Sequence, residues 1–201
     1  MKDTIRLIVV LTLIACGAGL LLSLVEQVTR APIAEQRRQE TLKALLAVMP
    51  AVDNSPDADT VSLVVGQDKK GRELTRIFYR GRNRGVLAGL AFKVVAPDGY
   101  SGTIEIMVGV DPEGTVTGLE ILAHAETPGL GSKIEQAWFK NQFLGKSLDN
   151  ADWRVKKDGG AFDQITGATI SPRAVVAAVA GGLEFYRKHQ AEVAADGGGK
   201  K

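Results

Sequence analysis

An uncharged apolar segment near the N-terminus constrains this chain more than any other feature of the sequence. Residues 7–25 contain no charged side chain and consist mainly of Leu, Ile, Val, Ala and Gly. As a helix, these residues reach roughly 28 Å, which is enough to cross the hydrocarbon core of a bilayer. We therefore expect residues 1–30 to form a transmembrane anchor, with the lipid bilayer as one partner of the chain.

Two processed forms of this segment are the alternatives. Residues 13–16 read Leu-Ile-Ala-Cys, which is similar to the site where bacterial lipoproteins are cleaved and lipidated on cysteine. The apolar run continues through residue 25, however, whereas a mature lipoprotein normally turns polar after its cysteine. A cleaved secretory signal normally has a shorter apolar core. Basic residues lie on both sides of the segment, so the positive-inside rule leaves its orientation open.

Composition excludes several classes of function for the rest of the 201-residue chain, which has room for one domain. The net charge is only +2. A local basic cluster at Arg80, Arg82 and Arg84 has few aromatic residues around it, so we interpret it as a solvated turn and expect no nucleic-acid partner. The single cysteine, Cys16, lies in the apolar segment, which excludes disulfides and thiolate catalysis. With only two histidines, no metal site is expected.

Helical and strand periodicities follow the anchor in a defined order. Proline within residues 29–33 is expected to break or tilt the first helix. An amphipathic helix is predicted over residues 33–49, and further helices over 133–143 and 173–190. The intervening strand candidates alternate with clear turns, for example at residues 68–71. These strands are residues 60–65, 74–80, 86–95, 103–110 and 116–123.

This order predicts an α+β fold in which a mostly antiparallel sheet has flanking helices. We divide the chain into the anchor, a juxtamembrane helix and connector over residues 31–60, and a single domain over residues 61–190. Residues 191–201 are rich in Gly and Lys towards their end and are expected to be disordered.

A glycine-rich loop after the last predicted strand is the first candidate binding segment. Residues 124–131 read His-Ala-Glu-Thr-Pro-Gly-Leu-Gly. Glycine has no Cβ, so the backbone of such a loop can approach a ligand closely. An ordinary connection between strand and helix fits the same residues, and His124 alone is more typical of a loop than of a catalytic site. Incomplete nucleotide-binding and hydrolase motifs at residues 144–147, 129–134 and 99–103 are interpreted as turns.

The second candidate segment places the hydroxyl of Thr169 behind two small residues and just before a predicted helix. Ser171 is a good N-cap and Pro172 suits the first helical position. Free N–H groups and the helix dipole would then face this turn, which suits a phosphate. A purely structural turn and cap fits the same residues. Threonine is a poor nucleophile and no Ser/His/Asp arrangement is evident, so another enzyme would have to attach a group to Thr169.

The order and spacing of these pieces resemble the FMN-binding G subunit of the Rnf-type electron-transport complex, called Rsx in some bacteria. That family is related to the C subunit of the sodium-pumping NADH:quinone reductase. Residues 163–169 resemble its Asp-x-x-(Ser/Thr)-Gly-Ala-Thr signature, in which the last threonine carries FMN through a phosphoester. The other matching pieces are the anchor and residues 29–33, 96–102, 108–111 and 124–131.

The resemblance implies a role for each matching site residue. Thr169 would be the FMN acceptor, loaded by a dedicated flavin transferase. Thr166, Gly167 and Ala168 would shape the phosphate turn, and Asp163 would help the transferase or the turn geometry. The loop beside the isoalloxazine ring would consist of Glu126, Thr127, Gly129, Leu130 and Gly131.

The resemblance also implies an electron relay within a redox-driven ion-translocating complex of the inner membrane. The domain would lie on the periplasmic face, with the other members of the complex as its partners. No catalytic residue and no metal of its own are implied. The related subunit of the sodium pump and a lipid-anchored binding module without a redox role are the alternatives.

Overall fold

The computed structural model describes residues 2–67 and 71–195. The chain divides into two compact units, residues 1–41 and residues 42–201. The first unit is the greater part of helix α1 (Lys2–Val48). By length and composition this helix can cross a membrane, and the side chains of its apolar segment are exposed. Thr12 donates its hydroxyl hydrogen bond to the Ile8 carbonyl at 2.8 Å, which satisfies this polar group within the helix.

Helix α1 continues through Pro32, so the first of the two expected outcomes at residues 29–33, a break, is wrong, whereas a tilt of a continuous helix stays a prediction. Proline removes one backbone donor and crowds the preceding turn, but helical residues on both sides keep the rest of the hydrogen-bond ladder. The predicted amphipathic segment 33–49 is therefore the C-terminal part of α1. The helix ends at Val48, shortly before Pro50.

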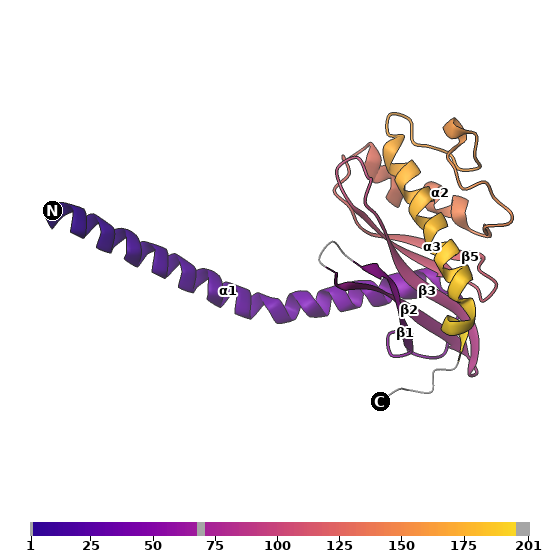
Figure 1. The fold of residues 1–201 in the computed structure, drawn as a ribbon, viewed down its shortest axis with the longest axis horizontal. Helices are drawn as coiled ribbons and strands as arrows, with labels where there is room; N and C mark the ends of the chain where they lie inside the picture. Colours follow the sequence, from indigo (N-terminus) through magenta and orange to yellow (C-terminus); the bar gives the residue numbers. More distant parts are fainter. Residues whose placement is uncertain (1, 68–70, 196–201) are drawn as a thin grey trace. The chain divides into compact units, whose positions relative to one another are not determined.

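Five antiparallel strands follow and form a sheet in sequential order (Figure 1). They are β1 (Thr60–Gln67), β2 (Glu73–Asn83), β3 (Val86–Ala96), β4 (Ile104–Val110) and β5 (Val116–Ala123). All five predicted strands are confirmed. The β2–β3 connection is a tight hairpin at Arg84 and Gly85, whose φ angles are 52° and 80°. Residues 68–70 of the predicted turn 68–71 lie outside the described residues.

Helix α3 (Ile170–Ala194) covers one face of the sheet (Figure 1). Its buried side chains, including Val179 and Leu183, join Phe78 and Phe92 of the sheet in the main hydrophobic core. Gly182 allows close packing, because a Cβ there would lie 2.5 Å from a methyl of Val94. The predicted helix 173–190 is present but extends further at both ends. Residues 196–201 of the predicted disordered tail lie outside the described residues.

The last turns of α1, from residue 42 onward, belong to the second unit and cover the other face of the sheet. Leu45 and Val48 are fully or almost fully buried there. A paired Gly109 and Gly118 make room for the backbone, since a Cβ on Gly109 would lie 2.0 Å from the Val48 carbonyl oxygen. Thr117 donates its hydroxyl to that carbonyl at 2.7 Å. The sheet therefore holds the end of α1 by close backbone packing and a hydrogen bond.

The predicted helix 133–143 is wrong, because this segment is divided into short turns. They are η1 (Gly131–Glu135), α2 (Ala137–Lys140) and η2 (Asn141–Phe143), and a further turn, η3 (Lys156–Asp158), follows. Ile134, Phe139 and Phe143 are all fully buried. In one continuous helix, residues at this spacing would point in different directions. The extended backbone of Gln136 breaks the helix and lets all three reach the core.

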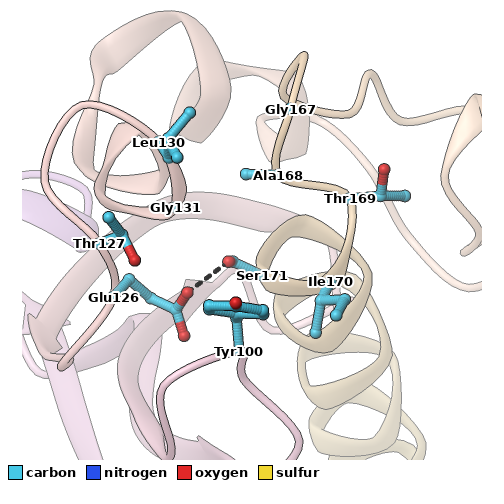
Figure 2. Close-up of a pocket in the computed structure, with 10 residues that line it drawn as sticks. All are labelled: Tyr100, Glu126, Thr127, Leu130, Gly131, Gly167, Ala168, Thr169, Ile170 and Ser171. Carbon is cyan, nitrogen blue, oxygen red and sulfur yellow. Dashed lines mark hydrogen bonds between the residues drawn. The ribbon is translucent and has the colours of Figure 1, made fainter.

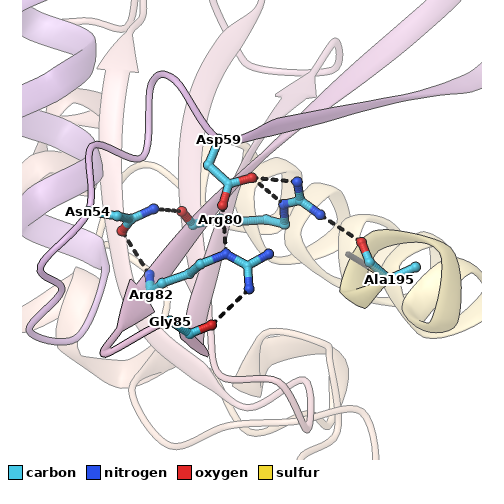
Figure 3. A network of polar contacts seen from close by, with 6 residues as sticks. All are labelled: Asn54, Asp59, Arg80, Arg82, Gly85 and Ala195. Carbon is cyan, nitrogen blue, oxygen red and sulfur yellow. Dashed lines mark hydrogen bonds and ion pairs between the residues drawn. The ribbon is translucent and has the colours of Figure 1, made fainter. Parts of the chain in front are cut away.

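Two members of the basic cluster, Arg80 and Arg82, lie in β2 and are at least partly buried and paired, so the interpretation as a solvated turn is wrong for them, whereas Arg84 is exposed in the β2–β3 turn. Arg80 is only 7% exposed, and Asp59 accepts hydrogen bonds from Arg80 Nε at 2.6 Å and Arg82 Nε at 2.7 Å (Figure 3). Burial pushes the pKa of Asp59 up, but the bonds from Arg82 and Arg80 outweigh burial and hold it below its usual value. Arg80 also donates to the Ala195 carbonyl at 2.7 Å, which ties the connector and β2 to the C-terminal end of α3.

Candidate functional site

A tight turn precedes α3 and carries the candidate acceptor threonine. The Ala168 N–H donates to the Ile165 carbonyl at 2.9 Å, and Gly167, the third residue of this turn, has a φ of 82°. A positive φ at this position is typical of a type II turn and favours glycine. Gly167 is therefore needed for the backbone conformation of this turn. The turn ends directly before Thr169, at the start of α3.

Thr169 itself occupies the N-cap position of α3, with a φ of −81° and a ψ of −27°. Its side chain makes no capping hydrogen bond to the helix. The prediction that Ser171 is the N-cap and Pro172 the first helical residue is wrong by two positions. Ser171 lies within the first turn and points into the protein, so its hydroxyl has a different partner. The Thr169 hydroxyl is thus at the helix N-terminus without a capping role.

The partner of Ser171 is Glu126, a buried carboxylate that joins three segments of the chain. Glu126 is 4% exposed, and its Oε2 accepts the Ser171 hydroxyl at 2.6 Å (Figure 2). Its Oε1 accepts the Ser101 N–H at 3.1 Å. A Cβ on Gly131 would lie 2.4 Å from Oε2, and one on Gly99 would lie 2.8 Å from Oε1. Glycine at both positions is what lets backbone surround this carboxylate.

His124 holds the backbone of the same loop. Its Nδ1 accepts the N–H of Glu126 at 3.0 Å, and its Nε2 lies 3.0 Å from Oε1 of Glu135. The ring is largely buried, with 12% of the side chain exposed. His124 is therefore part of the support of this loop, although its sequence context indicated only an ordinary loop residue.

These segments surround a cavity of about 340 Å³, which lies within the usual range for small-molecule sites. Glu126 and Thr127 lie on one side of it and Thr169 on the opposite side (Figure 2). Apolar side chains form much of the wall, and Tyr100 is 68% exposed. The lining residues are Tyr100, Glu126, Thr127, Leu130, Gly131, Gly167, Ala168, Thr169, Ile170 and Ser171.

The structure brings the two predicted segments together around one cavity, although they are far apart in the chain. Seven of the ten predicted site residues line it, and Asp163, Thr166 and Gly129 are not among its lining residues. Thr166 is exposed, and Asp163 forms an exposed ion pair with Lys156 at 2.7 Å. Gly129 has a φ of 75°, which fits a role in shaping the loop.

Tyr100, Ile170 and Ser171 line the cavity but were not predicted as site residues. Tyr100 lies in the β3–β4 connection, which was interpreted as a turn and was among the pieces that resemble the family, but no site role was assigned to it. Ser171 was assigned to the helix cap, and its partner Glu126 is 45 residues away. Among the described residues, no group of three or more His, Cys, Asp or Glu side chains could hold a metal ion. The chemistry that this site offers comes from several hydroxyl groups, one carboxylate and apolar walls.

Comparison with known proteins agrees with this arrangement. Residues 99–184 match the FMN-binding domain family, and these residues include every side chain that lines the cavity. In fold, the chain is similar to the C subunit of the Na⁺-translocating NADH-quinone reductase from Parabacteroides distasonis. That likeness has a TM-score of 0.57 at 18% identity and covers 78% of this chain and 94% of that one.

Curated relatives cover nearly the whole chain. The G subunit of the ion-translocating oxidoreductase complex from Aliivibrio fischeri is 43% identical over 191 residues, which are 92% of this chain and 90% of that protein. The protein of the same name from Pseudomonas aeruginosa is 44% identical over 85% of this chain and 82% of its own length. This chain therefore belongs to the family of G subunits of the ion-translocating oxidoreductase complex.

Proposed function

We propose that this protein is a membrane-anchored electron relay in a redox-driven ion-translocating complex, and that it carries FMN as a phosphoester on Thr169. The observation that carries the proposal is the position of Thr169. This residue is among those that line the cavity, it occupies the N-cap position of α3, and its hydroxyl makes no capping hydrogen bond. A phosphate esterified at this oxygen would meet the positive end of the helix dipole.

The residues of the cavity fit FMN. Tyr100, Leu130 and Ile170 offer apolar surface for a flat ring, and each of them is at least 44% exposed in the protein alone. The glycine-rich loop lets backbone approach the ring edge. When bound, FMN supplies the ability to accept and give electrons one at a time. The protein holds the ring, orients it and sets the charge around it.

The chain itself does not activate Thr169. The titratable side chains that line the cavity are Tyr100 and Glu126, and the Glu126 carboxylate is bound to Ser171 and Ser101. A separate flavin transferase must therefore present an activated flavin phosphate. The phosphorus of a flavin pyrophosphate donor bonds to the Thr169 oxygen as its bond to the second phosphate, the leaving group, breaks, and the hydroxyl proton passes to a base of the transferase. Asp163 and Thr166 are exposed outside the cavity, where such an enzyme can contact them or where they shape the turn.

We further propose that the protein is held in the inner membrane and works with the other members of the complex. Helix α1 anchors the protein in the inner membrane, since its exposed apolar segment has the length of a bilayer core. Lipidation at Cys16 does not fit, because the helix continues well beyond it, to Val48. The domain lies on the periplasmic side, and the other members of the complex deliver and remove electrons. A tether suits this location, because FMN lost outside the cytoplasm is not readily replaced.

Flavin fluorescence on a denaturing gel tests the attachment. The full-length protein is produced together with a flavin transferase, alongside Thr169→Ala and the control variant Thr75→Ala, which changes an exposed threonine of β2 outside the cavity. We expect a fluorescent band for the wild type and for Thr75→Ala, and none for Thr169→Ala. Fluorescence that persists in Thr169→Ala would show that Thr169 is not the acceptor.

A further inference from the structure

We propose that His124 is a positioning residue for the flavin site. Its neutral imidazole, protonated on Nε2, braces the loop between Glu126 and Glu135 and thereby holds the Glu126 carboxylate in the cavity wall. The inference extends the proposed FMN site and rests on it only for its redox consequence. The brace itself is a property of the protein alone.

The hydrogen-bond partners determine where the proton of His124 lies. A backbone N–H can only donate, so Nδ1, which lies 3.0 Å from the Glu126 nitrogen, must be an unprotonated acceptor. The proton of the neutral ring is then on Nε2, which lies 3.0 Å from a carboxylate oxygen of Glu135. A carboxylate that accepts one ring N–H is the common way in which proteins fix a histidine tautomer.

The two contacts of this ring lie on either side of the residues of this segment that line the cavity. Glu126 is the third residue after β5, which ends at Ala123, and Glu135 ends η1, which starts at Gly131. Leu130 and Gly131, between these two points, line the cavity. One imidazole therefore ties both ends of the segment that forms this wall.

The contact of His124 with the Glu126 backbone also affects the position of the Glu126 side chain. With its N–H held by His124, Glu126 directs its carboxylate to the Ser101 N–H and the Ser171 hydroxyl. Both of these donors are neutral, so the two hydrogen bonds fix the carboxylate in the wall of the cavity without placing a positive charge beside it. A nearby negative charge disfavours the addition of an electron to a bound flavin. His124 thus helps to set the redox potential without touching the cofactor.

Nitrogen NMR of the ¹⁵N-histidine-labelled full-length protein in detergent tests the tautomer directly. We expect His124 at neutral pH to show a proton on Nε2 and none on Nδ1, with or without flavin. A resonance pattern of the Nδ1-protonated ring would overturn the proposal. This measurement is independent of Thr169, so it separates failure of the brace from failure of the proposed flavin ester.

Three substitutions at one position distinguish positioning from general stability. His124→Asn places an amide oxygen near the former Nδ1, His124→Gln reaches only towards the former Nε2, and His124→Ala removes both contacts. We expect hydrogen exchange at the Glu126 amide to accelerate at least tenfold in the Gln and Ala variants and to stay close to wild type in the Asn variant.

The flavin potential should follow the same order. In the Gln and Ala variants the backbone of Glu126 no longer fixes the position of its carboxylate, and we expect the one-electron equilibrium to shift about tenfold towards reduction, which is ~59 mV more positive. The Asn variant should keep the wild-type potential. Rescue by Gln rather than Asn, or unchanged exchange and potential in the Ala variant, would contradict the positioning role.

Discussion

The two ends of helix α3 are both held by a charged side chain, but in opposite ways. At the N-terminal end the Glu126 carboxylate binds Ser171 of the first turn, and at the C-terminal end the Arg80 guanidinium binds the Ala195 carbonyl. Each charge has the sign that the helix dipole favours at that end. The difference lies in how each charge is balanced.

At the C-terminal end the two cations pair with an acid, because Asp59 contacts both Arg80 and Arg82 (Figure 3). At the N-terminal end the hydrogen bonds to Glu126 come from neutral donors, and the carboxylate borders the cavity. Paired opposite charges hold segments of a fold together, whereas a buried carboxylate beside a cavity, held by neutral donors, is more typical of a functional site. This contrast supports our proposal that the function lies at the N-terminal end of α3.

Arg80→Ala should have the largest effect on stability. It removes the cation that binds the end of α3 and leaves Asp59 with one arginine fewer, so we expect a loss of about 3 kcal/mol in the free energy of unfolding. Urea denaturation of the full-length protein measures this loss. Flavin attachment should be unchanged. The matched variant Arg154→Ala, which breaks an exposed pair with Asp152, should leave stability close to wild type. If Arg80→Ala lowered the free energy of unfolding only slightly, the C-terminal end of α3 would not differ from the N-terminal end in its importance for the fold.

Glu126→Ala should be less costly to the fold, at about 2 kcal/mol, because it leaves the buried Ser171 hydroxyl and the Ser101 N–H without their acceptor but also removes a buried charge. Glu126→Gln keeps an acceptor oxygen and should cost roughly 1 kcal/mol or less. The flavin of the Gln variant should become easier to reduce. Urea denaturation and a redox titration measure both effects. If Gln destabilises the fold as much as Arg80→Ala, Glu126 is a structural residue.

The smallest expected effect comes from Tyr186, a buried residue of α3. It concerns how the free energy of unfolding depends on pH. Its hydroxyl donates to the Pro112 carbonyl at 2.8 Å, and burial, followed by the charges of Asp111 and Glu113, raises its pKa to about 12. Between roughly pH 10 and 12 the unfolded chain loses this proton and the folded protein keeps it, so stability should fall as pH rises.

Tyr186→Phe should remove this alkaline decline. At neutral pH it should cost only about 0.5–1 kcal/mol, because Gln190 also donates to the Pro112 carbonyl and keeps it satisfied. Thermal unfolding as a function of pH compares the two proteins. An equally steep alkaline decline in the Phe variant would show that another group is responsible.

Sequence patterns within a few residues were enough to predict the apolar N-terminal helix, the five strands and the two glycine-containing loops, since periodicity and turn chemistry act locally. The burial of Arg80 could not be predicted, because it depends on Asp59 and on the end of a helix 115 residues away. The same applies to Ser171, whose partner lies in another loop. The failed helix at 133–143 reflects packing, since the core requires Ile134, Phe139 and Phe143 to point the same way.

Intact mass of the full-length protein, followed by peptide mapping, tests the central claim most directly. The account predicts one added FMN, joined with loss of water, on the peptide that contains Thr169, and fragmentation should place it on that residue. An unmodified Thr169 in a protein whose flavin is released on denaturation would contradict the account.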